Sequence, residues 1–178
     1  AKRSVRRWDL AATIQQDNND PDWTVGLKMS TDGLRFYIRH VTRFRDSAEF
    51  VRRSIKNTAG LDGPACRIEI PQDPGQAGKD QAKNIIAQNA GFTITALRET
   101  GDKGTRAEPF AAQLEAGNVY LEKGDWNEAF IDELCAFPIG HDDQVDAASG
   151  AFAFLTRTAG PLQISAKVLN RAKAPHRR

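Results

Sequence analysis

The chain has 178 residues, of which 40 % are hydrophobic and 27 % are charged, a composition that favours one globular domain over two. No stretch approaches the roughly 20 consecutive apolar residues that a membrane span needs, and no charged-then-apolar leader opens the sequence, so we expect a soluble intracellular protein. Ten of the 25 basic residues lie in 1–7 and 157–178, and these two segments contain no acidic residue. Basic ends around a mildly acidic body suit a protein that approaches a polyanion. The alternative is that the basic ends serve solubility alone.

Two classes of site are excluded by motif. Cys66 and Cys135 lie far apart in apolar surroundings without a C-x-x-C or Cys/His pattern, so neither a cysteine-based zinc site nor a disulfide framework is supported, and we predict buried free thiols. The only glycine-lysine pattern, Gly75 to Lys79, has the wrong spacing for a phosphate-binding loop and is followed by Asp80. The chain is therefore not a nucleotide-driven motor by itself.

Three segments with strand character open the chain. They are residues 5–13, 23–30 and 34–43. Turn clusters at 16–22 and 31–33 separate them, so we predict three antiparallel strands. Apolar residues then recur at helical spacing after Ser47, and Gly60 is predicted to close this helix.

The rest of the chain alternates strands and helices. The predicted strands are 66–70, 92–97 and 119–121, and the predicted helices are 48–59, 79–88, 107–116, 126–137 and about 142–158. The strand-helix-strand order between residues 66 and 97 implies a parallel crossover. We therefore predict an α/β fold, a mixed sheet with antiparallel hairpins first and parallel strands after, flanked by helices. Residues 1–158 form this domain, and 159–178 are expected to be a mobile basic tail.

Two aspartates occupy positions that folding does not require. Asp9 lies inside a predicted strand, where aspartate is disfavoured unless the strand edge faces water. Asp73 follows the carboxyl end of the strand 66–70, at the edge where open α/β sheets collect ligands, although an Asp before Pro-Gly is also an ordinary turn residue.

The densest acidic group is His141-Asp142-Asp143-Gln144-Val145-Asp146, at the start of the last predicted helix. Helix capping explains one or two of these acids but not the third, and Asp143 and Asp146 share a helix face. Clustered carboxylates repel one another unless a cation neutralises them, and oxygen ligands without cysteine favour Mg²⁺ or Mn²⁺. Two such ions would support phosphodiester hydrolysis.

Asp9 in the first hairpin, Asp73 after the fourth strand and the segment that opens the last helix resemble the nuclease domain of the large terminase subunit of tailed bacteriophages. The resemblance runs from about Trp8 to Leu155, and its most specific part is the string F-P-x-G-x-D-D-x-x-D-A over 137–147. Residues 102–109, 114–117 and 124–126 also resemble that family. The resemblance implies a ribonuclease H-like fold and a two-metal endonuclease that cuts concatemeric viral DNA at the start and end of packaging.

The resemblance also implies the roles of individual residues. Asp9, Asp73 and Asp143 match the metal-ligand aspartates of the family, and Asp146 matches an additional acid. His141 and Asp142 are candidates for contacts around these ligands. Lys103 and Arg106, in a predicted loop before the helix 107–116, are candidates for phosphate contacts or simply solvated charges.

The family has an amino-terminal ATPase domain whose phosphate-binding motifs this sequence lacks, so the chain resembles a carboxyl-terminal fragment. The implied partners are double-stranded DNA, that ATPase domain, the small terminase subunit and the portal, in the cytoplasm of the host cell and without a membrane. Two alternatives stay open on the same fold: a Holliday-junction resolvase-like nuclease, and a catalytically inactive DNA-binding or motor-docking module. Retention of every expected acid argues against the inactive module, because repelling carboxylates are not needed without a metal.

Overall fold

A six-stranded mixed sheet forms the centre of the protein. The computed structural model describes residues 3–11, 14, 16, 20–98 and 100–157, so the predicted tail 159–178 lies outside the described residues. The strands are β1 (Arg3–Asp9), β2 (Thr24–Thr31), β3 (Phe36–Phe44), β4 (Arg67–Pro71), β5 (Ile94–Leu97) and β6 (Val119–Leu121). Their order is β5-β4-β1-β2-β3-β6. The pairs β1–β2 and β2–β3 are antiparallel, whereas the pairs β1–β4, β4–β5 and β3–β6 are parallel. This confirms the predicted mixed sheet.

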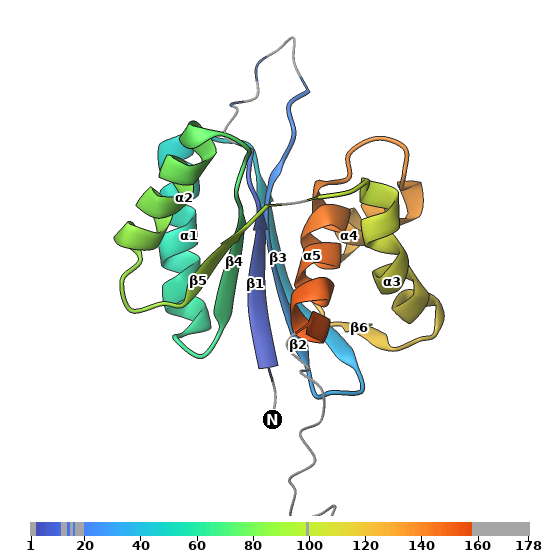
Figure 1. Cartoon of the computed structure of the whole chain (residues 1–178). Coiled ribbons are helices and arrows are strands. Elements are labelled where there is room, and N and C mark those ends of the chain that lie inside the picture. The colour runs from blue at the N-terminus through green and yellow to red at the C-terminus, as the bar shows by residue number, and fades with distance from the viewer. Residues whose placement is uncertain (1–2, 12–13, 15, 17–19, 99, 158–178) are drawn as a thin grey trace, which may run out of the picture.

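Helices cover both faces of the sheet (Figure 1). The helices are α1 (Ala48–Asp62), α2 (Gln76–Gln88), α3 (Lys103–Glu115), α4 (Asn127–Ala136) and α5 (Asp143–Arg157). Figure 1 shows α1 and α2 on one face and α3, α4 and α5 on the other. Within the described residues, no helix is long and apolar enough to span a membrane.

The alternation of side chains along β1 separates two hydrophobic cores. Val5 packs with β2, β3 and α5 in one core, whereas Trp8 packs with α1, α2 and β4 in the other. Since residues two apart on a strand point to the same face, Val5, Arg7 and Asp9 all face α5. Gly26 on β2 leaves room for the Trp8 ring, because a Cβ atom there would lie 2.8 Å from it.

Several boundaries differ from the sequence-based prediction. The first strand ends at Asp9 rather than at residue 13, and α1 continues past Gly60 to Asp62, where Gly63 caps it with a φ of +79°. Helix α3 begins at Lys103 because the Asp102 carboxylate accepts hydrogen bonds from the amides of residues 104 and 105. Cys66 is buried as predicted, but the prediction for Cys135 was wrong: it lies exposed on α4.

Candidate metal centre

The carboxyl ends of β1 and β4 place Asp9 and Asp73 at one edge of the sheet. The two strands are parallel neighbours in which Arg7 pairs with Glu69. Asp9 is the last residue of β1, and Asp73 lies two residues after the end of β4, in an exposed turn. The two residues therefore lie where these neighbouring strands end. Gly78 allows this turn to lie against α2, because a Cβ atom there would lie 2.3 Å from the Asp73 carbonyl oxygen.

A buried carboxylate on α4 fixes the start of α5. Glu133 Oε1 accepts a hydrogen bond of 2.6 Å from the backbone amide of Gln144, and Glu133 Oε2 accepts one of 2.6 Å from the Gln144 side chain. Arg43 on β3 forms an ion pair of 3.3 Å with the same carboxylate. The amino-terminal amides of a helix lack partners within the helix, so Glu133 both satisfies one of them and orients the first turn.

Asp143 is the buried carboxylate of that first turn, with only 5 % of its surface exposed. Among the described residues, its Oδ2 atom has no hydrogen-bond partner, although His141 Nδ1 lies 3.5 Å away. Burial raises the pKa of Asp143, and the neighbouring Asp22 and Glu133 carboxylates raise it further, against a hydrogen bond with the Trp23 backbone and the nearby His141. Such an unsatisfied buried oxygen is stabilised by a cation.

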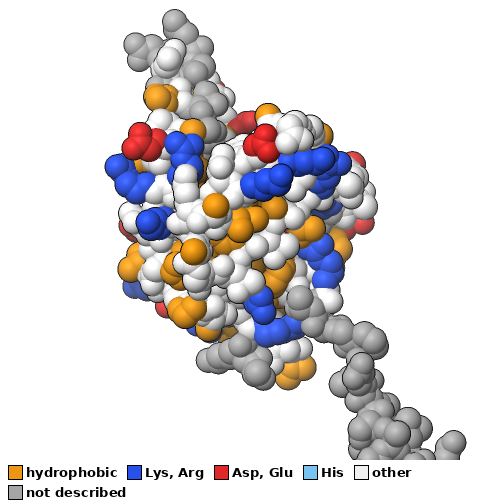
Figure 2. Space-filling view, turned by 60° about the vertical axis from the view of Figure 1, so that its left-hand side comes forward, with side chains coloured by type: hydrophobic (Ala, Val, Ile, Leu, Met, Phe, Trp, Pro, Cys, Tyr) orange, Lys and Arg blue, Asp and Glu red, His pale blue; other side chains and the backbone are white. Residues whose placement is uncertain are grey.

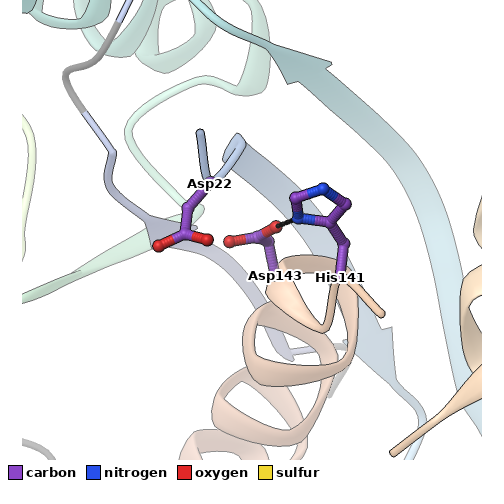
Figure 3. Close-up of side chains that lie close together, drawn as sticks. All are labelled: Asp22, His141 and Asp143. Atoms are coloured by element: carbon purple, nitrogen blue, oxygen red, sulfur yellow. Dashed lines mark ion pairs between the residues drawn. The ribbon is translucent and has the colours of Figure 1, made fainter. Parts of the chain in front are cut away.

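Asp22 and His141 complete a group of three possible ligands around Asp143 (Figure 3). One ligand atom from each residue lies within 4.8 Å of the others. Figure 3 shows the Asp22 carboxylate, from the segment before β2, pointing toward Asp143, with the imidazole of His141 on the other side. Two carboxylates and one imidazole form a mixed oxygen and nitrogen donor set for a divalent ion.

His141 is held by contacts on its other ring nitrogen. Its Nε2 atom lies 2.8 Å from Asp20 Oδ2 and 3.1 Å from an Arg45 guanidinium nitrogen. Arg45 also lies over the Trp23 ring, 3.9 Å from its centroid, and the Trp23 ring contacts the imidazole edge-on. These contacts leave Nδ1 directed toward Asp143 (Figure 3).

The other two acids of the string bind basic side chains of α3. Lys103 Nζ lies 2.7 Å from Asp142 Oδ1 and 2.9 Å from Asp146 Oδ2, and an Arg106 nitrogen lies 3.1 Å from Asp146 Oδ1. Burial opposes the charge of Lys103, but the hydrogen bonds to Asp142 and Asp146 raise its pKa above the ordinary value. Lys103 and Arg106 thus stand in the first turn of α3, not in the loop that we predicted.

The structure therefore brings together only part of the predicted ligand set. Within the described residues, the group around Asp143 includes His141 but not Asp9, Asp73 or Asp146. Asp22 was missed by the sequence analysis because it belongs to a cluster that reads as a turn, Asp20-Pro21-Asp22, and only the long-range position of α5 brings it to Asp143. The signal available in the sequence was the presence of three more carboxylates, Asp17, Asp20 and Asp22, before β2.

Residues 6–154 match the family model of the terminase RNase H-like domain. The chain belongs to this family. A comparison with curated protein sequences finds no match. The family assignment agrees with the mixed sheet flanked by helices.

Solved terminase nuclease structures share the fold of this terminase RNase H-like domain. The zinc-bound large terminase nuclease from the thermophilic phage G20c superposes with a TM-score of 0.65 at 20 % identity, over 85 % of this chain and 81 % of that chain. The terminase nuclease domain of human cytomegalovirus, soaked with Mn and bound to an inhibitor, gives 0.63 at 14 % identity, over 85 % and 82 %. The large terminase nuclease domain of P22 gives 0.63 at 14 % identity, over 88 % and 82 %.

Proposed function

We propose that this chain is the divalent-metal-dependent DNA endonuclease of a genome-packaging terminase and cuts concatemeric duplex DNA. The observation that carries the proposal is Asp143, a buried carboxylate with an unsatisfied oxygen beside Asp22 and His141, in a chain of the terminase RNase H-like family. We place the activity in residues 1–158.

The residues around Asp143 fit a divalent cation. Asp143 supplies a buried oxygen that lacks a hydrogen-bond partner, Asp22 supplies an exposed carboxylate, and His141 supplies Nδ1. When bound there, divalent ions supply Lewis-acid activation of water and stabilisation of the leaving oxygen in phosphodiester hydrolysis. The large terminase nuclease from phage G20c, which has a similar fold, has been solved with bound zinc, magnesium and cobalt. This supports a site in the present chain that accepts several divalent ions.

The proposed centre holds two ions, Mg²⁺ or Mn²⁺. Asp9 and Asp73 stand at the carboxyl ends of β1 and β4, the end of the sheet where α5 begins, and with Asp143 they are the ligands that the family resemblance implies. Asp146 would hold an ion with them only if Lys103 and Arg106, which pair with its carboxylate, moved away. Glu133 positions the first turn of α5 that carries Asp143, and His141 stands beside Asp143 as the nitrogen donor.

The same assignment names the partners that the domain would meet. These are double-stranded DNA, the ATPase domain of the large terminase, the small terminase subunit and the portal. We place the activity in the cytoplasm of the host cell, where viral particles are assembled. The contacts with these partners are proposals that rest on the family.

Supercoiled plasmid tests the proposed activity directly. We expect the full chain to nick and linearise it in Mn²⁺ or Mg²⁺, with little sequence preference, and to stop in excess EDTA, because the cluster offers carboxylates and an imidazole but no nucleophile of its own. Undiminished nicking in EDTA would contradict the proposal. Cleavage confined to four-way junctions would indicate a resolvase instead, and DNA binding without cleavage in any divalent metal would indicate an inactive DNA-binding module.

A further inference from the structure

A groove runs along α5 on the face that the helix turns toward β4 and β5. This α5 groove has a volume of about 320 Å³ and lies between β1, β4, the end of β5, α3 and α5. The residues that α5 contributes recur every three or four positions, as expected for one face of a helix. They are Asp146, Ser149, Gly150, Ala153 and Arg157.

The floor of the α5 groove contains a buried arginine. Arg7 of β1 is only 3 % exposed, and its guanidinium forms an ion pair of 3.0 Å with the buried Glu69 of β4. Gly150 lets this arginine lie directly against α5, because a Cβ atom there would lie 2.7 Å from Arg7 Nε. The fold thus keeps a guanidinium beneath the groove.

A second floor residue offers an unused hydrogen-bond donor. Ser149 is 4 % exposed, and among the described residues its hydroxyl has no hydrogen-bond partner. A buried hydroxyl without a partner loses free energy that a bound acceptor restores. Ser149 lies in the lining of the groove, so a group bound there can accept this hydrogen bond.

Basic side chains exceed acidic ones in the lining of the α5 groove. Arg98, after β5, and Arg157, at the end of α5, are exposed, and Arg106 of α3 is half-buried. With Arg7 they give four guanidinium groups against two carboxylates, Glu69 and Asp146. Figure 2 shows Lys and Arg side chains gathered around the apolar centre of the face that includes β5. This excess of positive charge fits an anion with several acceptor oxygens.

We propose that the α5 groove binds a phosphodiester group of the DNA strand at a position away from the cut. The rise of a helix places Gly150 about 10 Å, and Arg157 about 20 Å, along the α5 axis from Asp143. A phosphate in the groove would therefore contact the same helix as the metal centre and fix how far the strand extends beyond it. This inference rests on the proposed function, because that function makes DNA the ligand.

DNA binding in EDTA tests the groove without requiring cleavage. The probe is a fluorescent 20-base-pair duplex, titrated by anisotropy at several potassium chloride concentrations. We compare the full chain with the double variant Arg98→Gln/Arg157→Gln. The matched control is Arg52→Gln/Arg53→Gln, which removes two exposed charges from α1, on the opposite face of the sheet.

The double variant of the groove is expected to bind DNA at least about tenfold more weakly at low salt. The slope of the logarithm of the association constant against the logarithm of the salt concentration should become less steep by about 1.8, the value for two lost phosphate contacts. The control should stay within about twofold of the wild type. Ser149→Ala, which changes no charge, should weaken binding about fivefold with an unchanged salt slope, because it removes one hydrogen bond.

Equal binding by the groove variant and the α1 control would overturn the inference, and so would a wild-type chain that does not bind the duplex. If the groove variants lose DNA binding as expected but the wild type shows no metal-dependent nicking, the proposed function fails while the groove assignment stands.

Discussion

Asp143→Asn is expected to reduce plasmid nicking by about a hundredfold or more, because it removes a charged ligand of the metal. Substitution of a residue that only supports a metal ligand already reduces activity by up to about a hundredfold. The substitution keeps the size of the side chain but removes the negative charge that the cation requires. Burial raises the pKa of Asp143, so the fold disfavours its charged form. The variant should therefore melt at the same temperature as the wild type, or slightly higher, without metal.

A thermal melt with Mn²⁺ separates loss of the metal from loss of the fold. Binding of an ion to the folded state raises the melting temperature of the wild type, and we expect this rise to disappear in Asp143→Asn. The control is Asp132→Asn, an exposed aspartate on α4, which should keep both the nicking and the Mn²⁺ shift. An active Asp143→Asn variant with a normal Mn²⁺ shift would contradict the assignment of this residue.

Asp9→Asn and Asp73→Asn are expected to have effects as large as that of Asp143→Asn. Both residues stand at the carboxyl end of parallel strands, and an amide has neither the charge nor the chelating capacity of a carboxylate. Asp22→Asn should cost only about tenfold, because Asp22 is exposed and lies outside the secondary structure. The measurements are nicking rates over a range of Mn²⁺ concentrations, with a melt of each variant without metal.

The order of these effects distinguishes two ligand sets. Losses at Asp9 and Asp73 that exceed the loss at Asp22 would support the set that the family resemblance implies. A dead Asp22→Asn beside fully active Asp9→Asn and Asp73→Asn would restrict the centre to the group around Asp143 and His141. Asp80→Asn, an exposed aspartate of α2, serves as the control for a change of charge near Asp73.

The sheet could be predicted because its strands carry local signals. The hairpin strands are separated by turn residues, and the apolar residues of β4 lie between Gly63 and the turn at Pro74. Asp143 could also be found, because three acids at one helix start exceed what capping requires. These features depend on residues that are close together in the sequence.

The features that the sequence did not predict depend on contacts between distant segments of the chain. Helix α1 continues past Gly60 because Asp62 pairs with Arg6 of β1 at 2.7 Å and with Lys28 of β2 at 2.9 Å. Asp22 reaches Asp143 only after β2 has packed against α5. The pairing of Lys103 with Asp142 likewise joins the first residue of α3 to the residue before α5, and the sequence pattern does not indicate it.

A crystal of the full chain soaked in Mn²⁺, with anomalous scattering measured at the manganese edge, tests the central claim most directly, because it locates the ions and their ligands together. We expect an anomalous peak in contact with the Asp143 carboxylate, and a second peak at the carboxyl ends of β1 and β4 that shares ligands with it. A fully soaked crystal without a peak at Asp143, or with manganese bound only elsewhere on the surface, would contradict a metal centre at Asp143.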